Sequence, residues 1–298
     1  MRKPFAAAAA LVVAALTLGL AGCVTNEEGG RPDGWAPVSP EPVPELADRV
    51  PDDIRERGSI VIGTNPPFAP MEFRDSHGEV VGFDIDLAQA AASVLDLELT
   101  VREQDFPLIL PSITAGTVDF GASGFTSNEE RRETYDFVDY LDTGLQWARR
   151  PGSTVTPDTA CGAEIAVQRG TVADMEDLPA RSEACVEAGL EPIRKLAYQD
   201  ASTAATAVVL GRADALAADS PVSAWAVQRA DGQLELAGDI YDGAPFGWPV
   251  PQGSELAPLL ADALQHLIDS GDYARLCDMW GLADGAVDVA RINGEEPR

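Results

Sequence analysis

Short apolar runs alternate with amphipathic stretches along this chain from about residue 53 onward. Short runs, whether continuous or alternating, are typical of strands, whereas apolar residues spaced three and four positions apart predict helices. The expected strands lie at 60–64, 97–104, 118–124, 165–170, 192–198 and 213–219. The expected helices lie at 84–95, 106–116, 202–211, 220–230 and 256–268. This order of elements predicts an α/β protein.

Strands that alternate with helices favour parallel sheets. Two stretches interrupt the alternation, Tyr140–Ser153 and Asp239–Gly253, and both look extended and carry glycine, proline and aromatic residues. If both cross between domains, the segment between them is inserted into the rest of the chain. We therefore expect two α/β lobes joined by two hinge strands, with a ligand-binding cleft between the lobes. The expected boundaries are 53–144 with 245–288 for lobe 1, 145–244 for the inserted lobe 2, and 289–298 for a C-terminal tail.

The chain begins with a segment that has the layout of a secretory signal. Two basic residues precede an apolar run at 6–20, which is too short for a comfortable membrane span of about 20 residues. The run closes in LAGC, and small residues before a cysteine resemble a bacterial lipobox, in which the cysteine is lipidated. We expect a signal peptide at 1–22, a lipid anchor on Cys23, and attachment to the cell membrane after export. Residues 23–52 are rich in proline, which predicts a tether rather than a domain.

The charge and the cysteines narrow the function further. The formal net charge of −28 over 298 residues repels phosphate backbones, so nucleic acid is not an expected partner. The histidines are isolated and no cysteine has a CxxC neighbour, so we expect no metal and no cofactor. Cys161 and Cys185 flank one expected strand–helix unit, and export permits oxidation, which predicts a disulfide between them. Cys277 lies on an expected helix and fits a small buried apolar position.

One stretch poses a specific question about charge. In SGFTSNEERRETYDF, at 123–137, Asn128 begins an expected helix whose first turn carries Arg131 and Arg132. Cations are disfavoured there because the macrodipole already makes that end of a helix positive. Either the neighbouring glutamates neutralise both arginines on a solvated face, or one arginine and the free N–H groups bind an external anion.

Several motifs in order resemble those of extracellular solute-binding proteins of the polar amino acid class, which deliver a ligand to ABC importers. They are IGTNPPFAPMEFRDSHGEVVGFDIDLA (62–88), DFPLILPSITAGTVDFGASGFTSNEERRETYDFVDY (105–140), IAVQRGT (165–171), GRADALAAD (211–219) and SGDYARLCDMWG (270–281). The resemblance spans about 54–285. It implies a two-lobed periplasmic-binding-protein-like fold, an L-amino acid ligand, an ABC permease as partner, a monomer, and no catalysis.

The resemblance also implies which residues hold the two ends of an amino acid. Arg131 matches the arginine that grips the ligand α-carboxylate, which leaves Arg132 solvated. Thr126 matches a hydroxyl and Gly124 a backbone contact to the same carboxylate. Asp219 matches the acid that receives the ligand ammonium. The alternative for Asp219 is a helix cap, although Ser220 is the better cap for the helix that follows.

The remaining ligand positions also follow from the resemblance. Gly170 and Thr171 match a loop of the second lobe that closes onto the carboxylate, and Val172 replaces a frequent hydroxyl residue there. The other matches form the walls and the side-chain end of the site: Phe68, Phe106, Asn65 and Asp84. Core packing is the alternative for Phe106, and helix capping for Asp84. Cationic ligands in the family go with an acid at position 65, so asparagine there favours a neutral or polar ligand.

Two other functions remain open at this point. A few members of this fold are lyases or dehydratases, but those need a general acid or base in the cleft. His77 lies in an expected turn and His266 on the last amphipathic helix, and no GxSxG motif is present. The third reading is a sensory lipoprotein that binds an amino acid without transporting it.

Overall fold

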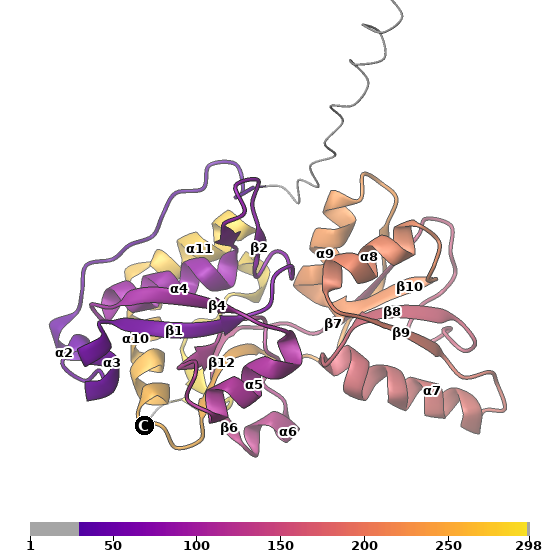
Figure 1. Cartoon of the computed structure of the whole chain (residues 1–298). Coiled ribbons are helices and arrows are strands. Elements are labelled where there is room, and N and C mark those ends of the chain that lie inside the picture. Colours follow the sequence, from indigo (N-terminus) through magenta and orange to yellow (C-terminus); the bar gives the residue numbers. More distant parts are fainter. Residues whose placement is uncertain (1–29, 297–298) are drawn as a thin grey trace, which may run out of the picture.

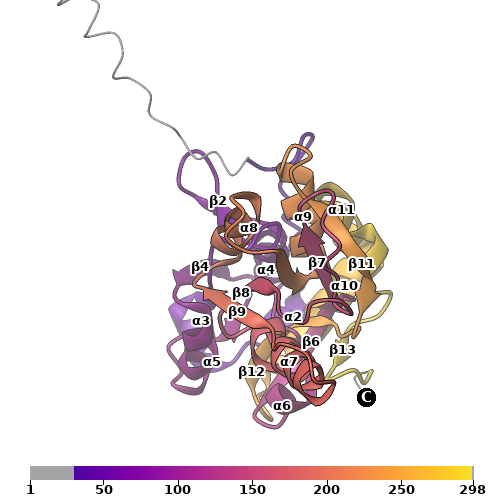
Figure 2. The same ribbon diagram turned by 90° about the vertical axis from the view of Figure 1, so that its right-hand side faces the viewer.

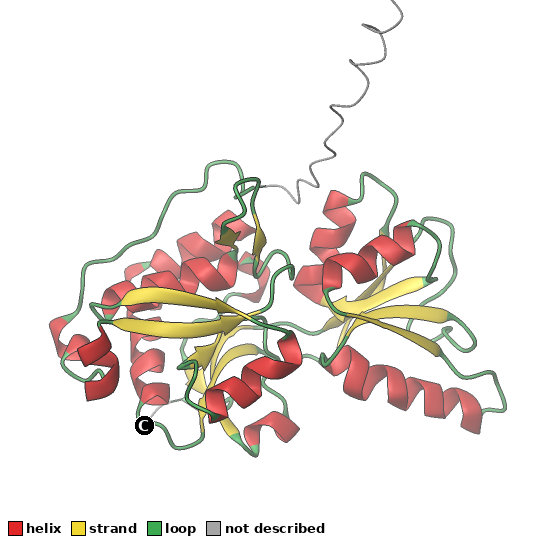
Figure 3. Cartoon of the chain, viewed as in Figure 1, coloured by secondary structure: helices red, strands yellow, loops and turns green. Residues whose placement is uncertain are grey.

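The computed structural model describes residues 30–296. Figure 1 shows two bodies side by side, each with strands at its centre and helices against them. Figure 3 shows the same division by element type. The expected two-lobed α/β arrangement is therefore observed. We call the body with both ends of the described chain lobe 1 and the other body lobe 2.

Lobe 1 contains a parallel sheet of order β4–β1–β5. Its strands are β1 (Ser59–Thr64), β4 (Glu98–Glu103) and β5 (Phe120–Gly121). The short helices that precede it are α2 (Pro44–Ala47) and α3 (Asp52–Arg57), and the longer ones that follow are α4 (Phe83–Val94) and α5 (Phe106–Thr114). The apolar face of α4 packs into the core through Leu87, Ala91 and Val94, as its spacing predicts.

A second sheet in lobe 1 is antiparallel, in the order β12–β6–β13. Its strands are β6 (Tyr135–Leu141), β12 (Phe246–Pro251) and β13 (Arg291–Ile292). The elements that complete the lobe are β2 (Phe73–Arg74), β3 (Val80–Val81), α6 (Glu129–Arg132), α10 (Leu256–Ser270), α11 (Asp272–Trp280) and η2 (Ala283–Gly285). The expected C-terminal tail therefore adds a strand to this sheet, and the Phe137 N–H donates to Asn293 Oδ1 at 2.8 Å.

Lobe 2 holds one five-stranded sheet of order β11–β7–β10–β8–β9. Its strands are β7 (Leu145–Arg149), β8 (Glu164–Gln168), β9 (Arg194–Tyr198), β10 (Ala215–Asp219) and β11 (Glu235–Tyr241). Its helices are η1 (Ala173–Asp177), α7 (Leu178–Glu187), α8 (Ala201–Val209) and α9 (Ser220–Arg229). Figure 2, turned toward this lobe, shows α7 and α8 in front of the molecule.

Two short connections join the lobes, at 142–144 and 242–245. They lie together, because the Ala244 N–H donates to Thr143 O at 3.1 Å and the Thr143 hydroxyl donates to Ala244 O at 2.8 Å. Both fall inside the two stretches that interrupt the alternation. The strands on either side pair antiparallel with their neighbours, so the expectation of parallel sheets was wrong for β6, β7, β11 and β12.

The proline-rich stretch before the lobes does not stay extended throughout. Val38 and Val50 are buried in the core of lobe 1, and the Trp35 indole donates to Asp86 at 2.6 Å. The prediction of a tether to residue 52 was therefore wrong from about residue 35, because isolated valines and a tryptophan supply enough apolar surface to pack. The expected signal peptide and Cys23 lie outside the described residues. No described helix is long and apolar enough to cross a membrane.

The predicted disulfide is present between Cys161, before β8, and Cys185 on α7. Their Cα atoms are 5.5 Å apart, and 24 residues separate them along the chain. Cys277 is buried on α11, as expected, and burial raises the pKa of its thiol to about 11. Among residues 30–296, no group of three metal-ligating side chains is placed to hold a metal.

Candidate ligand-binding site

Arg131 lies where the two lobes meet. Asn128 caps the single turn of α6 by accepting from the Arg131 N–H at 3.0 Å. The Arg131 guanidinium donates from Nη1 to Thr126 O at 3.0 Å and from Nη2 to Gly170 O at 3.2 Å. Gly170 belongs to lobe 2, so this arginine spans the lobes. Burial lowers the pKa of Arg131, and the charge of Asp219 is the largest effect that opposes the shift.

The expectation that Arg132 is solvated was wrong. The residue is half-buried, and its Nε donates to Ser127 Oγ at 2.9 Å. The neighbouring glutamates are exposed and do not pair with either arginine within salt-bridge distance. Both arginines are therefore half-buried and hydrogen-bonded to other parts of the fold, rather than lying on a solvated face.

Aromatic rings surround the guanidinium. Phe106 stacks on Phe125 with ring centroids 4.5 Å apart, and Arg131 Cζ lies 5.9 and 5.6 Å from the two centroids. The core-packing alternative for Phe106 is therefore confirmed, since the residue belongs to a small core cluster, whereas its role as a wall of the ligand site stays a prediction. Phe68 packs against Gly124, whose φ of +55° and missing side chain make room for the ring.

Asp219 ends β10 and is only 5% exposed. Burial raises the pKa of Asp219 to about 7, against the charge of Arg131 and the hydroxyl of Thr126. Asp219 holds the N-cap position of α9, but its side chain makes no cap hydrogen bond. Ser220 is the first residue of that helix, so its expected role as the cap was wrong. The carboxylate is therefore buried without a structural task in the helix.

An open hollow of about 830 Å³ lies beside Asp219. Thr126 lines it from lobe 1 and Val172 from lobe 2. Its acidic lining also includes Glu129, Glu176, Asp177 and Asp242, with Arg181 as the basic residue. A ligand ammonium at Asp219 would thus lie at the edge of an acidic hollow between the lobes.

The loop after β8 carries Gly170 and Thr171. The Gly170 N–H donates to Asp174 Oδ2 at 2.8 Å, and the Thr171 hydroxyl donates to Gln168 O at 2.9 Å. Gly170 has a φ of +81°, which favours glycine. These contacts fix the loop from within lobe 2 and leave the Gly170 carbonyl directed at Arg131.

Asn65 follows β1 and faces lobe 2. Its Nδ2 donates to Gln104 O at 2.9 Å, and its Oδ1 accepts from Gln168 Nε2 at 2.9 Å. Sequence reasoning missed Gln168, although a polar residue that closes the apolar run IAV was a visible signal. Gln168 is the residue of lobe 2 that donates to Asn65.

Asp84 does not cap its helix. It is fully buried and accepts from the Gly124 N–H at 2.7 Å, whereas the N-cap of α4 is Gly82. Burial raises the pKa of Asp84 to about 7, and burial raises the pKa of its neighbour Glu72 well above the ordinary value. The Ser123 hydroxyl donates to Glu72. Sequence reasoning missed Glu72, which together with Asp84 accepts hydrogen bonds from Ser123 and Gly124.

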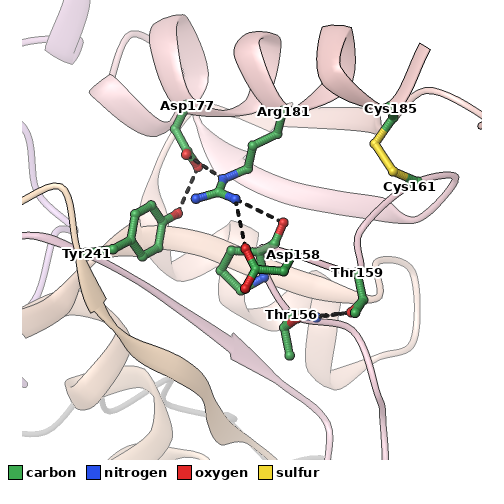
Figure 4. Close-up of polar contacts among 9 residues, drawn as sticks. Thr156, Asp158, Thr159, Cys161, Asp177, Arg181, Cys185 and Tyr241 are labelled. Atoms are coloured by element: carbon green, nitrogen blue, oxygen red, sulfur yellow. Dashed lines mark hydrogen bonds and ion pairs between the residues drawn. A yellow bond between two sulfur atoms is a disulfide. The ribbon is translucent and has the colours of Figure 1, made fainter. Parts of the chain in front are cut away.

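A polar cluster ties α7 to the end of β11 (Figure 4). Asp177 Oδ1 accepts from Arg181 Nε at 2.6 Å, and Asp177 Oδ2 accepts from the Tyr241 hydroxyl at 2.9 Å. The Arg181 guanidinium also lies 4.6 Å from the Tyr241 ring centroid. This cluster fixes the helix that follows the Gly170 loop to the strand that enters the hinge.

Residues 60–283 match the family of bacterial extracellular solute-binding proteins, family 3. The chain belongs to this family. It is 53% identical to the arginine-binding protein ArgT of Corynebacterium glutamicum over 98% of this chain and 96% of that protein. A mutant of ArgBP from T. maritima has a similar structure, with a TM-score of 0.70, 28% identity and coverage of 79% of this chain and 99% of that one.

An ancestral arginine-binding protein bound to arginine is also similar in structure, with a TM-score of 0.69, 28% identity, and coverage of 75% of this chain and 98% of that one. The resemblance predicted from the motifs is thereby confirmed, as are the fold class and the assignment to binding proteins rather than enzymes. The roles of individual residues in ligand binding stay predictions for this family 3 protein.

Proposed function

We propose that this chain is the substrate-binding lipoprotein of an ABC importer and that it binds an L-α-amino acid with a cationic side chain, L-arginine first. The observation that carries the proposal is that a half-buried Arg131 and a buried Asp219, which act on each other through their charges, lie at the junction of the lobes. A zwitterionic ligand satisfies both charges, which makes an amino acid a better partner than a simple acid or amine. The similarity to an arginine-binding protein supports the choice of ligand.

The carboxylate end of the ligand falls to lobe 1. The Arg131 donors meet the carbonyls of Thr126 and Gly170. A carboxylate is a stronger acceptor than a carbonyl and matches the planar guanidinium with two parallel bonds. Ligand entry would therefore exchange these carbonyl contacts for a bidentate pair, with the Thr171 backbone alongside, while the Gly124 N–H stays bonded to Asp84.

The side-chain end would lie toward Asn65, with the rings of Phe68 and Phe106 as the expected walls. Asparagine favoured a neutral ligand in the sequence, but an amide oxygen also accepts from a guanidinium or ammonium. Aromatic faces attract cations, and the net charge of −28 favours a cationic over an anionic ligand. These properties accommodate arginine without an acid at position 65.

Closure of the lobes would complete the site. Arg131 and Asn65 of lobe 1 meet Gly170 and Gln168 of lobe 2 only when the lobes are together. A ligand that bridges them shifts the protein toward the closed form by its difference in affinity for the two forms. The closed form is then what a permease would receive.

A thermal-shift screen against the standard amino acids tests the proposal. A ligand at about 100 times its dissociation constant adds about 2.7 kcal/mol to the free energy of unfolding, which such a screen detects. We expect arginine to give the largest shift. A screen in which no amino acid raises the melting temperature would refute the proposal, and a larger shift with a neutral amino acid would refute the cationic class. Membrane retention that survives Cys23→Ser would refute the lipid anchor.

A further inference from the structure

Residues 35–50 lie along lobe 1, and we call this segment the strap. At its start, the Trp35 indole donates to Asp86 Oδ2 at 2.6 Å, and the Trp280 indole donates to the same oxygen at 2.9 Å. Val38 follows and is buried in the core of lobe 1. The chain is therefore fixed to lobe 1 from Trp35 onward, by hydrogen bonds and by apolar packing.

This attachment limits how far lobe 1 can lie from the proposed lipid anchor. Residues 24–35 are the twelve residues from Cys23 to the start of the strap, and fully extended they span at most about 40 Å. A tether that stayed extended to residue 52 would span about 100 Å. Since a small domain is already about 30 Å across, the shorter reach keeps the membrane on the side of the molecule where the strap begins.

The strap begins close to the place where α9 of lobe 2 meets lobe 1. Trp280, which shares Asp86 with Trp35, packs edge-on against Phe73 of β2, with ring centroids 5.9 Å apart. Phe73 in turn contacts Trp225 of α9, with centroids 5.7 Å apart. Figures 1 and 2 both show the described chain beginning on the side of β2 and α9, with α7 on the opposite side. The side of α9 is therefore the one nearest the proposed anchor.

A groove of about 540 Å³ lies on this side, between α8 and α9. Its larger apolar side chains are Val209, Val222, Trp225 and Leu234. Arg229 supplies the charge in its lining; the residue is exposed, and its Cζ lies 5.8 Å from the ring centroid of Trp225. Ala69 joins the lining from lobe 1. Because both lobes contribute, the groove has this shape only when the lobes are together.

We propose that the permease docks on this groove, which takes an apolar side chain with a neighbouring carboxylate from an external loop of the permease. The inference rests on the proposed function and names the surface that meets the partner. Tryptophan and arginine are the residues that most often anchor protein interfaces, and Arg229 matches an acidic partner. The net charge of −28 disfavours an anionic lipid surface as the occupant. A partner that binds this groove also distinguishes closed lobes from open ones.

Uptake of radiolabelled L-arginine by cells that carry this chain and its permease tests the role of the groove. We expect Ala226→Phe, which fills the groove, and Arg229→Glu, which reverses its charge, each to lower uptake about tenfold or more. Neither residue belongs to the proposed ligand site, so both variants should bind arginine like the wild type in isothermal titration. Arg194→Glu is the matched control, because Arg194 is exposed on β9 and does not line the groove, and its uptake should not change.

Energy transfer to the membrane tests the orientation that the strap imposes. A donor dye is placed on Ala224→Cys of α9 or on Glu187→Cys of α7, both exposed positions, while Cys277 is buried. The lipidated protein is then bound to phosphatidylcholine vesicles that carry an acceptor dye. We expect more transfer from position 224 than from position 187. An insert of about 30 glycine and serine residues before residue 30 should reduce this difference, because it lengthens the reach.

Unchanged uptake in Ala226→Phe and Arg229→Glu would overturn the inference, as would a fall in uptake that Arg194→Glu reproduces or that a loss of arginine affinity accounts for. Equal transfer from positions 224 and 187 would also overturn it. If Cys23→Ser protein binds phosphatidylglycerol vesicles and Arg229→Glu abolishes this binding, lipid is the occupant and the inference fails. In all these cases arginine binding by the purified protein leaves the proposed receptor standing. A wild-type protein that binds no amino acid would overturn the proposed function, and the inference with it.

Discussion

Replacing Asp219 by asparagine should show how much the contact with the ligand ammonium contributes to affinity, because the variant leaves the other contacts of the site in place. The carboxylate is 5% exposed, and burial raises its pKa from 3.8 to about 7. At 1.36 kcal/mol for each pKa unit, keeping this carboxylate ionised costs roughly 4 kcal/mol, which a ligand ammonium is suited to offset. Asparagine has the same shape but no charge, so the ammonium would be buried unpaired.

The expected loss follows from that imbalance. Removing one partner of a buried charge pair costs about 3 kcal/mol or more, so Asp219→Asn should weaken arginine at least about 100-fold. The α-keto acid of arginine lacks the ammonium, so the difference in affinity between arginine and this keto acid should be smaller in Asp219→Asn than in the wild type. In Arg131→Met, the difference in affinity between arginine and its decarboxylated amine should instead become smaller. Isothermal titration of both variants with the three ligands measures these differences.

The raised pKa also sets a pH dependence for the wild type. Below about pH 7 Asp219 is protonated before the ligand binds, and the ammonium must displace that proton. Affinity should therefore be greatest above pH 7 and fall by about tenfold for each unit below it, whereas Asp219→Asn should lose this dependence.

Asp242→Asn is the control, because Asp242 lines the same hollow but is exposed. If Asp219→Asn binds arginine like the wild type, or if Asp242→Asn weakens it as much, the carboxylate does not pair with the ammonium.

Three further predictions concern stability. Gly124→Ala should lower the free energy of unfolding by about 2 kcal/mol or more, because at φ +55° the new Cβ would overlap the ring of Phe68. Gly116→Ala is the control, since its φ is +65° but nothing lies within 4 Å, and it should cost only about 1 kcal/mol. Equal losses for the two variants in urea unfolding would contradict the steric argument. Burial raises the pKa of Asp84 to about 7, so the folded state binds more protons than the unfolded state between about pH 4 and 7. The free energy of unfolding should therefore fall as the pH rises from about 4 to 7, and Asp84→Asn should make this fall smaller. If the pH dependence of stability is the same in Asp84→Asn and in the wild type, the reasoning is contradicted. Replacing Cys161 and Cys185 together by serine should lower the free energy of unfolding by about 3 kcal/mol, and a variant that matches the oxidised protein in calorimetry would show that the bond does not stabilise the fold.

The order of strands and helices was predictable from the sequence because local periodicity determines it. The run IVIGT became β1, and the spacing at 84–95 became α4, since apolar residues at these periods can be buried only in those conformations. The two interruptions of the pattern also coincide with the connections at 142–144 and 242–245. Arg131 and Asp219 were found through motifs, which record residue types at fixed distances along the chain.

Contacts between segments distant in sequence were decided only by the tertiary structure. The burial of Val38 and Val50, and the strand formed by Arg291 and Ile292, depend on surfaces that other segments supply. Whether Asp84 caps a helix or holds Gly124 cannot be judged from spacing, because both partners are available in the sequence and only the packing selects one. Gln168 is the clearest case. The sequence shows that residue 168 is a glutamine, but only the fold brings it into contact with Asn65, 103 positions away. There its side-chain oxygen is buried without a hydrogen-bond donor among residues 30–296.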